Sequence, residues 1–139
     1  MCDSDIRWIQ RFDNFCKALA QMTKFMEKGE LNELEEQGLI KSFEYTFELG
    51  WKVLKDLLDY QGLEGLIGSR DAIREAFKQG LLGNEEDGQV WMDMIKSRNL
   101  AAHAYDETKM KMIVGAIERH YFQQFLALKG RLQVLSERA

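Results

Sequence analysis

The sequence predicts an all-α protein, an antiparallel up-and-down helical bundle of four long helices and one short helix in a single domain spanning residues 1–139. The chain contains no proline, so no helix is interrupted by a residue that lacks a backbone N–H. Apolar residues recur at alternating spacings of three and four, the period of a helix with one buried face. Glycines stand where these patterns stop, as expected of turns between helices.

The first two helices are expected over about 5–28 and about 32–60, with Gly29 and Gly62 near their ends. The first carries one apolar seam, formed by Trp8, Phe12, Phe15, Leu19, Met22 and Met26. The second carries two stripes on nearly opposite faces: Ile40, Phe43, Phe47, Trp51, Leu54 and Leu58, and then Leu49, Val53, Leu57 and Tyr60. A helix that is apolar on two sides must be covered on both. It therefore either lies centrally in the bundle or packs its second face on another subunit.

The remaining helices are one short and two long segments. Ser69 offers an N-cap for a short helix over about 70–79 that ends at Gly80. A further helix is expected over about 85–100, with Trp91, Met94 and Ile95 facing inward. Asp106 offers an N-cap for the last helix, over about 107–136. Its seam consists of Val114, Ile117, Tyr121, Phe125, Leu128, Leu132 and Leu135.

The composition excludes several classes of protein. A net charge of −4 argues against a protein that coats nucleic acid by bulk electrostatics, although it allows a small basic cleft. Cys2 and Cys16 alone cannot form a structural zinc site, and Cys16 lies on an apolar stripe, where a small buried hydrophobe is expected. No apolar run approaches the about 18 residues that span a bilayer, and no signal peptide is visible. We therefore expect a cytoplasmic protein without a metal site, a cofactor or a membrane contact.

Chemistry is concentrated in residues 98–105, whose sequence is RNLAAHAY. Arg98 follows Trp91 by seven residues, so it continues the inward face of its helix. A guanidinium there needs a carboxylate or a phosphate. The simplest interpretation is an ion pair with an acid at the edge of the core, such as Glu44 or Glu48.

His103 would point about 140° away from Arg98 if the helix continued. The two side chains can face one substrate only if the helix ends near Leu100 or if a dimer brings them together. Asn99 and His103 are four residues apart and could touch on a helix. A lone histidine is more often a hydrogen-bonded structural residue, and we interpret the other histidine, His120, as structural because it borders the seam of the last helix.

Arg, Asn, His and Tyr within eight residues are more specific together than any one of them. An arginine can hold a phosphate with two hydrogen bonds, and an imidazole can move a proton near neutral pH. These groups suit metal-independent cleavage of RNA by its own 2′-OH, although the residues alone do not show the reaction.

Several motifs together resemble one protein family. They are FEYTFELGWK at 43–52, REAF at 74–77, WMDM at 91–94, SRN at 97–99 and HAYDE at 103–107. In this combination the chain is similar to the nucleotidyltransferase substrate-binding proteins, which belong to the HEPN superfamily of small helical domains and include HepT-like toxins.

The resemblance implies a helical bundle that forms a homodimer and has a minimal, MntA-like nucleotidyltransferase as its partner. It also implies an Arg-polar-x(3 to 5)-His ribonuclease motif, matched here by Arg98, Asn99 and His103. Tyr105 matches the tyrosine that the partner adenylylates to silence the toxin. The leading interpretation is therefore a metal-independent endoribonuclease toxin, and the alternative is a non-catalytic subunit that binds a substrate or nucleotide for the nucleotidyltransferase. A helical interaction protein with a structural Arg–His pair is a third possibility.

Overall fold

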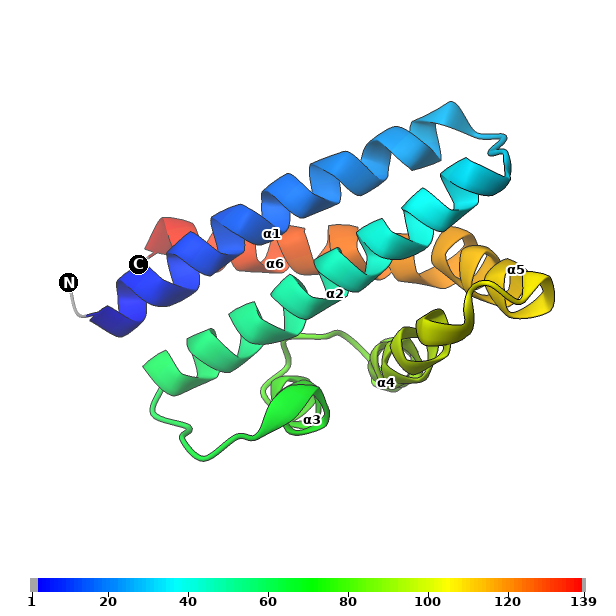
Figure 1. The fold of residues 1–139 in the computed structure, drawn as a ribbon. Coiled ribbons are helices and arrows are strands. Elements are labelled where there is room, and N and C mark those ends of the chain that lie inside the picture. The colour runs from blue at the N-terminus through cyan, green and yellow to red at the C-terminus, as the bar shows by residue number, and fades with distance from the viewer. Residues whose placement is uncertain (1–2, 139) are drawn as a thin grey trace.

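The computed structural model describes residues 3–138, and its elements are all helical (Figure 1). The helices are α1 (Asp3–Lys28), α2 (Glu33–Tyr60), α3 (Gly68–Lys78), α4 (Glu85–Leu100), α5 (Glu107–Ala116) and α6 (Phe122–Arg138). A 3-10 turn, η1 (Ala101–His103), follows α4, and a π-helical turn, η2 (Ile117–Tyr121), joins α5 to α6. The predicted all-α bundle is confirmed.

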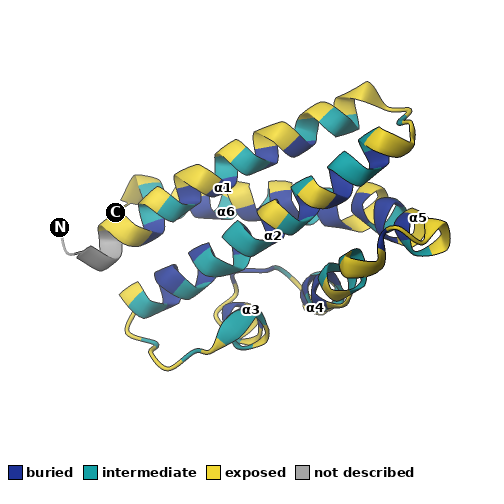
Figure 2. Ribbon diagram, in the orientation of Figure 1, coloured by how far each residue is buried: buried dark blue, intermediate teal, exposed yellow. Residues whose placement is uncertain are grey.

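The core forms where the predicted seams meet. In Figure 1, α1 and α2 run antiparallel as a long pair with α6 behind them, and in Figure 2 buried residues alternate with exposed ones along both helices. An aromatic cluster lies at the centre, with neighbouring ring centroids 5.2 to 6.4 Å apart. Its members are Phe43, Phe47, Trp91, Tyr121 and Phe125. Aromatic residues supply much of the stabilisation of such a core because each buries a large apolar area.

The second apolar stripe of α2 was expected to be covered either by the rest of the bundle or by another subunit. The structure shows the first, because α2 lies centrally in the bundle. Val53 and Leu57, on that stripe, are fully buried by the rest of the chain. Tyr60 is 41% exposed at the end of the helix and Leu49 is half-buried. The second stripe is therefore mostly covered without another subunit, and it gives no reason of its own to expect a dimer.

Helix α4 crosses α2 instead of running along it. Trp91 packs against Phe47 and Gly50 of α2, and Arg98, two turns later on α4, bonds to Glu48. In Figure 1, α4 is accordingly seen nearly along its axis while α2 lies in the plane of the picture. This crossing brings the last turn of α4, with Arg98, onto the middle of α2.

Two predicted details are wrong. Ser69 does not cap α3, because the helix already begins at Gly68 and the N-cap residue is Ile67. Gly68 has φ of +76°, a conformation that glycine adopts without strain, and it turns the chain into the helix. The carboxylate of Asp71 accepts the N–H of Ile67 at 3.1 Å, and the N-cap residue itself makes no side-chain capping bond.

The predicted last helix is also interrupted, because the π-helical turn η2 separates α5 from α6. A π turn adds one residue to a helical turn, but the spacing of four from Ile117 to Tyr121 and from Tyr121 to Phe125 is also ordinary for an α-helix, so the pattern did not reveal the turn. Tyr121 ends this turn, and its hydroxyl lies 2.7 Å from that of Ser97 on α4. The turn therefore helps to fix α4 against the last helices.

Cys16 is half-buried and packs against the core, and burial raises the pKa of its thiol, which disfavours the reactive thiolate. Cys2 lies outside the described residues. Over the described part of the chain, no helix is both long and apolar enough to cross a bilayer.

Candidate functional site

Arg98 lies in the last turn of α4, where a positive charge also complements the helix dipole. Its Nη1 donates to Glu48 Oε2 at 2.8 Å, and Lys52 Nζ lies 3.5 Å from the other oxygen of Glu48. The expected ion pair with Glu44 or Glu48 is thus formed with Glu48. Glu44 lies nearby without bonding to Arg98 in the described structure.

The side chains of Arg98 and Glu48 are each 36% exposed and border a hollow of about 490 Å³. The residues that line it are Lys41, Glu44, Tyr45, Glu48, Leu49 and Arg98. A guanidinium has five N–H donors, and the bond from Arg98 to Glu48 uses only one of its nitrogens, Nη1. The remaining donors suit an anionic ligand in the hollow.

The pKa of Glu48 lies below its ordinary value of 4.5. Partial burial would raise this pKa, but the nearby Trp51 indole, the hydrogen bond from Arg98 and the charges of Lys52 and Arg98 outweigh burial. Glu48 is therefore ionised at neutral pH and can hold Arg98 in one orientation.

His103 and Tyr105 lie on a short turn that follows α4. The α-helix ends at Leu100, but the backbone winds on as the 3-10 turn η1 through His103, so the end of α4 does not by itself bring Arg98 and His103 to the same ligand. Ala104 is 7% exposed and anchors the turn in the core, while its neighbours His103 and Tyr105 are exposed. Gln37 of α2 donates to the carbonyl of Ala104 at 2.9 Å. The turn is therefore held by Ala104 and Gln37 on its buried side, and the rings of His103 and Tyr105 are exposed to solvent.

The end of this turn is fixed by Asp106. Its N–H donates to the carbonyl of His103 at 3.0 Å, and its side chain accepts the N–H of Lys109 at 3.2 Å. Asp106 is the N-cap of α5, as predicted. These bonds give the exposed His103 a defined backbone position.

His103 Nδ1 lies 3.3 Å from the hydroxyl of Tyr105, and the two rings meet edge to face with centroids 5.9 Å apart. The predicted site residues thus form two groups, Arg98 with Glu48 and His103 with Tyr105. Asn99 is exposed at the end of α4. Within the described chain, no hydrogen bond joins Arg98 or Asn99 to His103.

Beyond Glu44 and Glu48, sequence reasoning missed the residues that α2 contributes to the site. Gln37, Lys41 and Tyr45 are spaced by four residues, so they share one face of α2 with Glu48 and Lys52. This spacing could have indicated that the residues lie together, but only the crossing of α4 over α2 shows which face of α2 lies beside Arg98. His120, expected to be structural, is exposed in η2 beside a hollow between α4 and α5. Among the described residues, no three acidic, histidine or cysteine side chains are grouped to hold a metal.

Comparisons with known proteins show the family and the fold of the chain. Residues 10–134 match the model of a protein family described as "Nucleotidyltransferase substrate binding protein like". Over 85 residues, 58% of this chain, the sequence is 32% identical to a Haemophilus influenzae protein named "Probable ribonuclease HepT". The match spans 56% of that relative, little more than half its length. The chain also resembles a Thermus thermophilus protein of known crystal structure, with a TM-score of 0.77 and a sequence identity of 32%. The match covers 86% of this chain and 98% of the Thermus thermophilus chain.

Proposed function

Because the chain belongs to the nucleotidyltransferase substrate binding protein-like family, we propose that it is the helical partner of a minimal, MntA-like nucleotidyltransferase and acts as a metal-independent endoribonuclease. In this proposal, residues 1–139 form one cytoplasmic domain, the toxin of a toxin–antitoxin pair. The similarity to a relative named as a ribonuclease supports the activity. The single structural observation that carries it is an exposed His103 on an anchored turn directly after the helix end that bears Arg98.

The proposed chemistry is attack of an RNA 2′-OH on the adjacent phosphate. The 2′-oxygen gains a bond to phosphorus and gives its proton to a base, while the bond to the 5′-oxygen breaks and that oxygen takes a proton from an acid. The products are a 2′,3′-cyclic phosphate and a 5′-hydroxyl. Arg98 neutralises the phosphate, Asn99 orients a reacting group, and His103 transfers a proton.

A homodimer completes this site in the proposal. One chain offers one His103, whereas the reaction uses both a base and an acid. An isologous interface with both motifs near its two-fold axis repeats every residue in one cleft. The imidazole of one protomer then serves as the base and that of its partner as the acid, and each Arg98 faces the shared phosphate.

Tyr105 is the proposed regulatory residue. It is 83% exposed and its hydroxyl lies 3.3 Å from His103. Transfer of AMP from ATP to this hydroxyl, with release of pyrophosphate, would add a negative charge and a nucleoside beside the imidazole. Such a group fills the space that RNA needs and occupies His103.

A non-catalytic subunit that binds substrate or nucleotide for the nucleotidyltransferase is the second candidate. One observation favours it: Arg98 is already paired with Glu48 and makes no described contact with His103. In that case the hollow beside Arg98 binds an anion without cutting it.

The test is an RNA-cleavage assay with the purified chain and with Arg98→Ala and His103→Ala. We expect the wild type to cleave single-stranded RNA and each variant to lose cleavage while keeping its helicity and melting temperature. The matched control is His120→Ala, which removes the chain's other exposed histidine and should leave cleavage intact. An inactive wild type that still binds nucleotide would favour the second candidate.

A further inference from the structure

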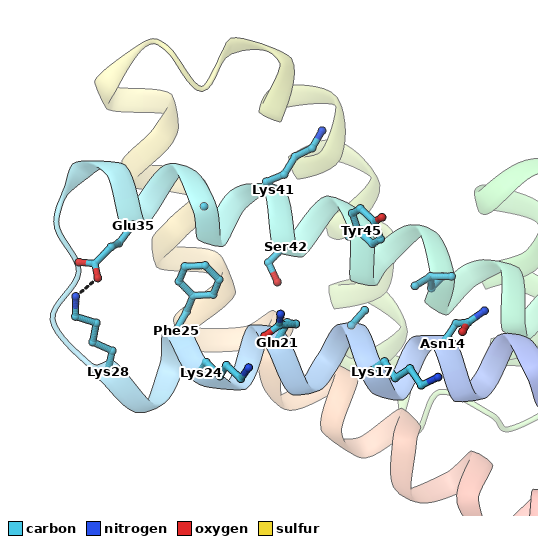
Figure 3. Close-up of a pocket in the computed structure, with 13 residues that line it drawn as sticks. Asn14, Lys17, Gln21, Lys24, Phe25, Lys28, Glu35, Lys41, Ser42 and Tyr45 are labelled. Atoms are coloured by element: carbon cyan, nitrogen blue, oxygen red, sulfur yellow. Dashed lines mark hydrogen bonds and ion pairs between the residues drawn. The ribbon is translucent and has the colours of Figure 1, made fainter.

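A long groove lies between the outward faces of α1 and α2, with a volume of about 1010 Å³ (Figure 3). We call it the α1–α2 groove. Its walls are two rows of side chains that repeat at helical spacing. From α1 they are Asn14, Lys17, Ala18, Gln21, Lys24, Phe25 and Lys28, and from α2 they are Glu35, Gly38, Lys41, Ser42, Tyr45 and Leu49.

The groove is basic in a chain whose net charge is −4. Lys17, Lys24, Lys28 and Lys41 line it, whereas Glu35 is the one acid among the lining residues. Lys28 pairs with Glu35 and bridges the two helices at one end, as Figure 3 shows. Lys24 and Lys41 form no ion pair with any described residue. The groove therefore has cations available for an anionic partner.

The floor of the groove is apolar and aromatic. Phe25 lies against Gly38, where an added Cβ would come within 3.2 Å of its ring, so glycine lets this ring sit between the helices. Leu49 is half-buried, and Tyr45 is 65% exposed. Lysines that follow a backbone, combined with an exposed aromatic ring on which a base can stack, are typical of surfaces that bind single-stranded nucleic acid.

The groove is continuous with the hollow beside Arg98, because Lys41, Tyr45 and Leu49 line both. Tyr45 thus lies on the boundary between them. The lysine row of α1 from Lys17 to Lys28 extends about 16 Å at the rise of an α-helix. That is room for about five stacked nucleotides at about 3.4 Å each.

We propose that the α1–α2 groove binds single-stranded RNA and leads it to Arg98. Lys24 and Lys41 contact backbone phosphates, and the ring of Tyr45 stacks on the base that passes from the groove into the hollow. This inference deepens the proposed function and rests on it for the fate of the bound RNA. It assigns the recognition of substrate to α1 and α2, outside the segment 98–105.

The experiment measures binding separately from cleavage. The probe is a fluorescein-labelled single-stranded RNA of about twelve nucleotides, within the size range of known single-strand sites. Fluorescence anisotropy is recorded at several salt concentrations on the full chain carrying His103→Ala, so that the probe stays intact. Lys24→Gln with Lys41→Gln should weaken binding at low salt by about tenfold or more. The slope of log affinity against log salt should become shallower by about 1.4, since each lost phosphate contact removes about 0.7.

Matched variants isolate the two contributions. Lys78→Gln with Lys129→Gln removes the same charge from exposed positions on α3 and α6, and should leave both affinity and salt slope unchanged. Tyr45→Ala should weaken binding about fivefold or more without changing the slope, and Tyr45→Phe should restore it, because stacking needs the ring and not the hydroxyl.

The outcomes separate this inference from the proposed function. If the groove variants weaken RNA binding but the wild-type chain cuts no RNA, the result would support RNA binding in the groove and refute the proposed ribonuclease activity. If the salt slope is unchanged, or if the Lys78 and Lys129 control loses as much affinity as the groove variant, the proposal of RNA binding in the groove is wrong, even if the wild type is an active ribonuclease. If the lysine substitutions instead change the molar mass by light scattering, the groove is an interface between copies of the chain and the inference is wrong.

Discussion

The pair formed by Arg98 and Glu48 allows a structural role and a chemical role to be separated by measurement. The two side chains form a 2.8 Å ion pair and are each 36% exposed. Ion pairs at such exposure stabilise a protein by about 0.2–1 kcal/mol, because water screens the charges and ordering two long side chains costs entropy. Arg98→Ala and Glu48→Gln should therefore each lower the free energy of unfolding by at most about 1 kcal/mol.

This free energy converts into a small change in melting temperature. An unfolding entropy of about 2.1 cal/mol/K per residue gives about 0.3 kcal/mol/K for 139 residues, so 1 kcal/mol corresponds to about 3 °C. Phe125→Ala, which empties a fully buried position, should cost about 3–5 kcal/mol and lower the melting temperature by about 10 °C or more. Thermal unfolding followed by circular dichroism distinguishes the two ranges.

Cleavage should respond far more strongly than stability. Removing one group that stabilises the charge of a transition state typically costs about 100- to 1000-fold in rate, and we expect this of Arg98→Ala. Glu48→Gln should cost about tenfold, because the guanidinium loses the charge that orients it. Lys52→Gln is the matched control, since it removes the other cation near Glu48 and leaves the Arg98 bond in place.

A double-mutant cycle tests the coupling. If Glu48 acts only through Arg98, then Glu48→Gln should have no further effect on cleavage once Arg98→Ala is present. Losses that multiply independently would show that Glu48 acts on its own. If Arg98→Ala lowers the melting temperature as much as Phe125→Ala does, Arg98 is a structural residue, and the proposed chemical role of the Arg98–Glu48 pair is refuted.

Three further expectations concern assembly, regulation and pH. Light scattering at micromolar concentration should give the mass of a homodimer, and a monomer would contradict the shared cleft. Co-expression with a minimal nucleotidyltransferase should raise the intact mass by one or more AMP units, and Tyr105→Phe should abolish the increase; an unmodified complex of the two proteins would favour substrate presentation. The native pKa of Glu48 is lowered from 4.5, so its carboxylate stabilises the fold above that pH, and the stabilisation is lost as pH falls through the native value. The difference in unfolding free energy between wild type and Glu48→Gln should therefore be largest at neutral pH and vanish in acid; a difference independent of pH would show that Glu48 acts by packing.

The seams were predictable because burial repeats with the turn of the helix. Phe15, Leu19 and Met22 of the first seam are at most 2% exposed, as the spacing of three and four indicates. The start of α3 was not predictable in this way. The helix starts at a left-handed Gly68, and the carboxylate of Asp71 bonds to the N–H of Ile67, without the expected Ser69 cap; both features depend on the path of the preceding loop.

For the site, the sequence identified the reactive groups but not their surroundings. It suggested an acid such as Glu44 or Glu48 beside Arg98, and the crossing of α4 over α2 selects Glu48. Lys41 and Tyr45 join the same hollow for the same reason. Their relation to Arg98 depends on how two helices far apart in sequence pack, which periodicity along one helix does not specify.

The turn at 101–106 explains why catalysis and regulation would be coupled in our proposal. Ala104 fills a buried position and its carbonyl is held by Gln37, while its two neighbours are both exposed. A larger residue at 104 would have to displace core atoms, which would move His103 and Tyr105 together. Any group attached to the Tyr105 hydroxyl begins 3.3 Å from the imidazole, so a modification there cannot leave His103 unaffected. In the proposal, silencing by a single adenylylation then requires no conformational change elsewhere in the bundle, because the modified hydroxyl already lies beside the imidazole.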